Sequence, residues 1–281
     1  MKRNVVFEVK KLMREPSLHN ISFLAITFVS ISFIIDAIGY IGYDLSDIQS
    51  ASNMWILVLG NVSIIKQRLF LDVYLLLAVP IIIGDSYLVE NELNIIPIIL
   101  SRTNRFARFF SKSIVAFLCS VIVVAIPLIL DQLLWLTCFP IYGFEPLGRN
   151  EPTYNLLNNV MESFSSELFR LNYPYLYNLL FVIINTIFGW SLGLFSQIVS
   201  FLGVKSKIVI IMTPAIILNF LTICISQFGN EADNVITYLY YPTGFDSYKG
   251  VLYPFTFILP LIAFELLIIY YFSCRRRPEN G

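Results

Sequence analysis

The residues of this sequence that could do chemistry are concentrated in one stretch, residues 85–113, which reads DSYLVENELNIIPIILSRTNRFARFFSKS. Asp85, Glu90 and Glu92 come first, an isoleucine-rich run follows, and four bases come last. This order of acids and bases suits a helix dipole, although Pro97 forbids one uninterrupted helix. A loop that only fixes topology needs the bases, but it needs neither the acids nor the isoleucines. We therefore predict that this stretch is a docking surface for another protein.

Motifs for catalysis are missing from the sequence. Only Lys112 and Lys205 precede a serine, and neither has the glycine spacing of a phosphate-binding loop. HExxH and GxSxG do not occur, and the four cysteines and His19 form no ligand-like cluster. We predict that the chain is not an enzyme, has no catalytic residues, and binds no metal or cofactor of its own.

The elements that carry these residues are those of an integral membrane protein. Mean hydropathy is +0.74, and only 14% of residues are charged, against about 25% in soluble proteins. A spanning helix needs about 20 mostly apolar residues. Six stretches meet this need and predict an all-α fold: 20–43, 71–87, 114–137, 176–202, 208–228 and 251–273.

The lysines and arginines predict how these spans are oriented. Most of the 19 fall on one side if both termini are cytoplasmic, as the positive-inside rule requires. Residues 2–16 are predicted to form an amphipathic interfacial helix, with Val5, Val9 and Leu12 on its apolar face. Residues 138–175 form a long outer connection with a helical apolar pattern, which indicates either a surface helix or a lid over an exit path.

Glu265 is the intramembrane polar candidate. It lies well inside the last predicted span, in PLIAFELLIIYY, and that helix has no base that could pair with it. Charge inside a bilayer is costly and usually marks a partner or a functional path. We expect the side chain to be protonated or to have a partner on another helix.

The charged stretch also carries a resemblance to a known family. Asp85-Ser86-Tyr87 is followed by Glu90 and Glu92, then by Ile99-Leu100-Ser101-Arg102, then by Arg105 and Ser111-Lys112. This pattern of about thirty residues resembles that of ABC-2 type transporter permeases. In that family the second span ends in a similar acidic step, and a short amphipathic coupling helix docks onto a separate ATPase. The resemblance makes residues 88–104 the coupling segment.

The resemblance also implies which residues dock onto the ATPase. They are the acids Glu90 and Glu92, the apolar residues Ile95, Ile96, Ile98, Ile99 and Leu100, and the bases Arg102 and Arg105. Buried apolar anchors dominate the energetics of protein interfaces, and rim charges contribute less. Removing charge and anchor together is therefore predicted to weaken docking most.

The resemblance implies the membrane subunit of an exporter in the plasma membrane of a bacterium. Such a permease pairs with a second permease copy or a homologous one, and with two P-loop ATP-binding cassette subunits that bind ATP and magnesium. The predicted cargo is amphipathic or peptide- or antibiotic-like, and no nucleic acid is involved. Two alternatives stay open: an ion-coupled secondary transporter with Glu265 as coupling carboxylate, and a non-transporting membrane scaffold or sensor.

Overall fold

The structure is a computed structural model that describes residues 2–39, 41, 50–52, 55, 73–84, 86–93, 105–141, 173–202, 204–228 and 253–275. The all-helical prediction is confirmed for this part of the chain. Its elements are α1 (Lys2–Met13), α2 (Pro16–Ile38), α4 (Leu75–Ile83), α5 (Ser86–Glu92), α7 (Arg105–Ser120), the π-helical segment η4 (Val121–Ala125), α8 (Ile126–Cys138), α11 (Pro174–Phe201), α12 (Lys207–Phe228) and α14 (Tyr253–Arg275).

Three helical stretches are long and apolar enough to cross a membrane: Pro16–Ile38, Phe110–Cys138 and Pro174–Phe201. They overlap the predicted spans 20–43, 114–137 and 176–202. Two shorter apolar stretches, Lys207–Leu221 and Ile258–Tyr271, overlap the predicted spans 208–228 and 251–273. α4 lies within the predicted span 71–87. These are the helices of a membrane protein, while the count of six spans and the side on which the termini lie stay predictions.

The helices also expose large apolar side chains, as the helices of a membrane protein do. Phe23 and Ile34 of α2, and Ile216 and Phe220 of α12, are each more than half exposed. A water-soluble protein rarely leaves large apolar surfaces uncovered, whereas lipid tails cover such side chains at no cost.

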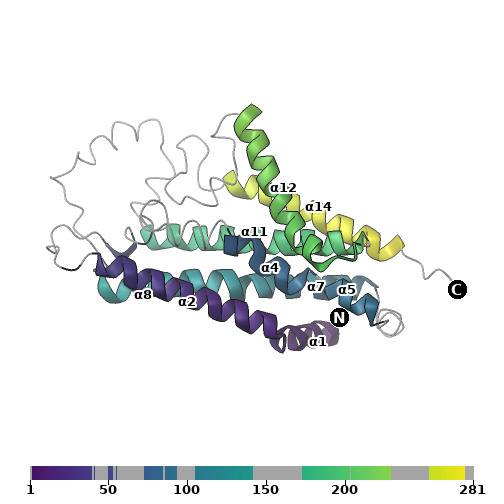
Figure 1. The fold of residues 1–281 in the computed structure, drawn as a ribbon, viewed down its shortest axis with the longest axis horizontal. Helices are drawn as coiled ribbons and strands as arrows, with labels where there is room; N and C mark the ends of the chain where they lie inside the picture. The colour runs from purple at the N-terminus through teal and green to yellow at the C-terminus, as the bar shows by residue number, and fades with distance from the viewer. Residues whose placement is uncertain are drawn as a thin grey trace.

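Helix α11 lies at the centre of the arrangement (Figure 1). It contacts α4, α5, α7, α8, α12 and α14, while α2 lies along α8 and α1 lies along α7. Small residues on α11 permit this close approach. A Cβ atom added at Gly193 would lie 2.7 Å from Cγ1 of Val79 in α4, and one added at Gly189 would lie 2.7 Å from Oγ of Ser120 in α7.

Hydrogen bonds between helices also tie α11 to its neighbours. The Ser120 hydroxyl of α7 donates to the carbonyl oxygen of Thr186 in α11. The indole N–H of Trp190 donates to the carbonyl oxygen of Ser113, and the Ser196 hydroxyl donates to the carbonyl oxygen of Ile210 in α12. These bonds satisfy polar groups where lipid and apolar side chains could not.

The predicted span 114–137 is interrupted. Between α7 and α8 the chain forms η4, in which the backbone N–H of Ile126 bonds to the carbonyl oxygen of Val121, five residues earlier. Pro127 follows directly and has no N–H to donate, so the regular helical ladder is broken at this point. A π-turn accommodates the missing bond within an otherwise continuous apolar helix.

The N-terminal helix ends earlier than the predicted 2–16. α1 ends at Met13, and Pro16 is the first residue of α2 rather than the last residue of α1. Proline suits this position because the first helical N–H has no partner within the helix. Lys10 and Lys11 fall in the last turn of α1, where positive charge interacts favourably with the helix dipole. Lys11 is thereby placed next to the short helix α5.

Candidate functional site

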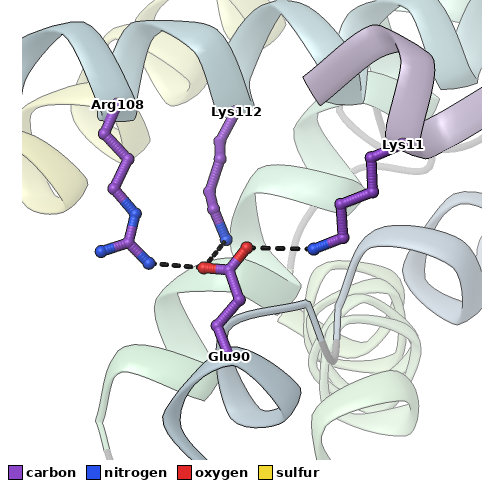
Figure 2. Close-up of polar contacts among 4 residues, drawn as sticks. All are labelled: Lys11, Glu90, Arg108 and Lys112. Atoms are coloured by element: carbon purple, nitrogen blue, oxygen red, sulfur yellow. Dashed lines mark hydrogen bonds and ion pairs between the residues drawn. The ribbon is translucent and has the colours of Figure 1, made fainter. Parts of the chain in front are cut away.

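The candidate site is an ion-pair cluster that joins three helices. α5 follows α4 directly and presents Glu90, α1 contributes Lys11, and α7 contributes Arg108 and Lys112. Arg108 and Lys112 are four residues apart and so share one face of α7. Figure 2 shows the Glu90 carboxylate pointing toward all three cations. We call these four residues the Glu90 cluster.

The contacts of the Glu90 cluster use both carboxylate oxygens. Nζ of Lys11 lies 3.1 Å from Oε1 of Glu90, and Nζ of Lys112 lies 2.9 Å from Oε2. The guanidinium of Arg108 also donates to Oε2. Hydrogen bonds between charged partners are stronger than those between neutral groups. One carboxylate therefore holds together three segments that are distant in sequence.

Burial differs among the members of the cluster. The side chain of Glu90 is 4% exposed and that of Lys112 is 8% exposed, while that of Lys11 is 43% exposed. A buried acid requires partners, whereas a half-exposed lysine can turn to water instead. The pair of Glu90 with α7 is thus the structural centre, and Lys11 attaches α1 to it.

The cluster lowers the pKa of Glu90. Burial acts to raise it, but the charges of Lys112, Arg108 and Lys11 and the hydrogen bond from Lys112 outweigh burial and bring the pKa from 4.5 to about 2. The carboxylate is therefore ionised at neutral pH, and the ion pairs with α1 and α7 are intact there.

We expect the cluster to make the protein acid-sensitive in a defined window. A group with a lowered pKa stabilises the fold above its unfolded pKa, and this contribution is lost as pH falls through the folded pKa. For Glu90 the window runs from pH 4.5 down to about 2. Thermal unfolding in detergent should show wild type losing more stability across this window than Glu90→Gln. Parallel pH profiles of the two proteins would contradict the assignment.

The placement of Glu90 differs from the docking role expected of it. Glu90 is 3% exposed and contacts cations of its own chain, so its charge points inward rather than toward a partner. Glu92, two residues further along, is exposed. Arg105 begins α7, whereas residues Ile95, Ile96, Ile98, Ile99, Leu100 and Arg102 lie outside the described residues. So do residues 142–172 of the outer connection.

Sequence reasoning missed the partners of Glu90. Arg108 and Lys112 carry a local signal, because bases four residues apart on an amphipathic helix share a face. Lys11 carries none, because its contact joins positions 79 residues apart. The sequence shows these charges but does not show which acid forms ion pairs with them.

Glu265 has a partner on a neighbouring helix. It lies in α14, is 2% exposed, and each carboxyl oxygen is 3.0 Å from the Ser191 hydroxyl of α11. That hydroxyl has a single proton to donate, so the two oxygens share it. The contact ties α14 to the central helix. Among the described residues, no group of three His, Cys, Asp or Glu side chains is placed to hold a metal ion.

No protein-family model, curated protein or solved structure matches this chain.

Proposed function

We propose that this chain is the membrane-spanning permease subunit of an ATP-driven exporter in a bacterial plasma membrane. It would work as a dimer with a second permease and with two P-loop ATPase subunits that bind ATP and magnesium. The cargo would be an amphipathic molecule, such as a peptide or an antibiotic. The proposal starts from the resemblance of residues 85–113 to the coupling region of ABC-2 type permeases.

The observation that carries the proposal is the Glu90 cluster. A coupling segment must transmit movement at its surface to the spanning helices, and this requires firm attachment at its base. The predicted coupling segment 88–104 begins within α5, and Glu90 attaches α5 to α1 and α7 through ion pairs. A partner that pulls on the segment would therefore also move α7, which continues into the long apolar stretch Phe110–Cys138.

The proposed mechanism separates docking from transmission. Glu92, Arg105 and the apolar run Ile95–Leu100 with Arg102 form the docking surface, while Glu90 links that surface to α1 and α7. Closure of the ATPase subunits upon ATP binding shifts the helices between two arrangements. Differential affinity of the ATPase dimer for the two arrangements drives this shift.

A charge-reversal pair tests the proposal. The chain alone should hydrolyse no ATP, and the chain purified in mild detergent from its native membrane should carry a P-loop ATPase with measurable hydrolysis. Reversing one acid and one base of the docking surface, Glu92→Lys with Arg105→Glu, should release that ATPase. Glu162→Lys with Arg170→Glu is the matched control, because the sequence places both residues in the outer connection. Transport by the chain alone in ATP-free vesicles would overturn the proposal.

A further inference from the structure

A pocket of about 180 Å³ lies beside the Glu90 cluster, among residues of α1, α4, α5, α7, α11 and α12. By the same measure, a site for one water molecule needs only about 10–15 Å³. Its lining combines charged groups of both signs with apolar side chains. The lining residues are the acids Glu8 and Glu15, the bases Lys11, Lys112 and Lys207, the amide Gln197, and the apolar residues Leu12, Ile82, Ile83, Val89 and Val115.

The pocket lies where three apolar helical stretches have their ends. Glu15 directly precedes the stretch Pro16–Ile38, and Lys112 falls in the first turn of Phe110–Cys138. Gln197 lies four residues before the end of Pro174–Phe201. The ends of spanning helices lie at the boundary between hydrocarbon and headgroups. The pocket is therefore at the depth of lipid headgroups, and its apolar walls continue toward the hydrocarbon.

The charges of the lining match a zwitterion. Three cations, Lys11, Lys112 and Arg108, contact the single carboxylate of Glu90, and Lys207 adds a further positive charge to the pocket lining. The half-exposed Lys11 has three N–H donors, so its ion pair with Glu90 leaves capacity for a phosphate oxygen. Glu8 is buried and lines the same pocket, and with Glu15 it offers carboxylate oxygens to an ammonium group.

We propose that this pocket binds a phospholipid headgroup that carries both a phosphodiester and a primary ammonium, the chemistry of phosphatidylethanolamine. The phosphate lies among Lys11, Lys112 and Lys207, and the ammonium lies beside Glu8 and Glu15. The acyl chains leave along the apolar walls. This site does not depend on the proposed transport function.

The same polar chemistry also occurs in a soluble molecule, glycerophosphoethanolamine. Only the lipid uses the apolar lining residues Leu12, Ile82 and Val115, so the two sources are distinguishable. Native mass spectrometry of the delipidated protein should detect binding of added dioleoyl phosphatidylethanolamine. We expect weaker binding of dioleoyl phosphatidylglycerol and dioleoyl phosphatidylcholine, and no competition by millimolar glycerophosphoethanolamine.

Two matched pairs of lysines localise the site. Lys11→Gln with Lys207→Gln should weaken phosphatidylethanolamine binding by at least about tenfold, because two charge-assisted hydrogen bonds to the phosphate become weaker, neutral ones. Lys10→Gln with Lys205→Gln removes the same charge from exposed neighbours that do not line the pocket, and should leave binding unchanged. Lys207→Gln alone repeats the test without touching the Glu90 cluster, in case the double variant unfolds.

The acids test the ammonium half of the proposal. Glu8→Gln with Glu15→Gln should remove the preference for phosphatidylethanolamine over phosphatidylglycerol. The proposal is overturned if phosphatidylglycerol binds wild type as tightly, if the soluble headgroup competes, or if the Lys10 and Lys205 control loses as much binding as the Lys11 and Lys207 variant.

Discussion

Glu90→Ala is expected to lower the free energy of unfolding by about 3–5 kcal/mol, the range for removal of one partner of a buried ion pair. The loss is large because Arg108 and Lys112 are mostly buried and would keep their charges without an acid nearby. Lys11 is nearly half exposed and would turn to water. The measurement is unfolding in detergent, followed with a thiol-reactive dye that reports exposure of the buried Cys119. The other three cysteines of the sequence, Cys138, Cys224 and Cys274, are replaced by serine so that only Cys119 can react.

Glu92→Ala is the matched control for this prediction. It removes the same type of side chain from the same short helix, but Glu92 is exposed. Its effect should stay within about 0.5 kcal/mol, as for most surface substitutions. Lys11→Gln should cost less than about 1 kcal/mol, since exposed ion pairs contribute little. Equal losses for Glu90→Ala and Glu92→Ala would show that the cluster does not stabilise the fold.

A double variant separates the ion pair from other effects of the substitutions. Glu90→Gln with Lys112→Gln removes the acid together with one buried base, so fewer charges are left unpaired than in Glu90→Gln alone. The double variant should therefore lose less stability than the sum of the two single variants. Additive losses would mean that Glu90 and Lys112 do not interact.

The helical class and the long apolar stretches could be predicted because they depend only on the number of consecutive apolar residues in the sequence. A run of about 20 apolar residues has the length of the bilayer whatever it packs against, and Pro16–Ile38 and Pro174–Phe201 both have this length. The interruption at η4 also had a local signal, because Pro127 cannot donate the bond that a regular helix requires there. That a π-turn would absorb the loss was not readable from proline alone.

The inward direction of Glu90 could not be predicted, because it depends on contacts between distant segments. α5 is short, and its sequence does not decide which face meets α7. α5 follows α4, which lies close against α11 at Gly193, and α5 itself also contacts α11. Once α5 is fixed there, Arg108 and Lys112 lie opposite its inner face, and burial of Glu90 becomes favourable. The two glutamates of residues 85–113 thus differ, because Glu90 is a buried anchor and Glu92 is exposed.

Gly193→Leu should disrupt that approach and lower the free energy of unfolding by about 1–3 kcal/mol or more, the cost of overpacking a tight core. A Cβ at this position already lies 2.7 Å from Cγ1 of the buried Val79 and 3.8 Å from Cβ of Ala116. Leucine adds three further carbons between α11, α4 and α7. The higher helix propensity of leucine opposes this loss by only about 1 kcal/mol. The measurement is the same detergent unfolding assay with the Cys119 readout.

Gly39→Leu is the matched control, because Gly39 is exposed just after α2 and the nearest atom to an added Cβ is the carbonyl oxygen of Asp36 at 3.2 Å. It should change stability little. Val79→Ala removes the methyl groups that clash and should make Gly193→Leu less costly than it is in wild type, a favourable coupling between residues in contact. If Gly193→Leu is as mild as Gly39→Leu, the close packing of α11 on α4 is not what holds α5 in place. The link from the central helix to the Glu90 cluster would then have to run through α7 and through the direct contact of α11 with α5.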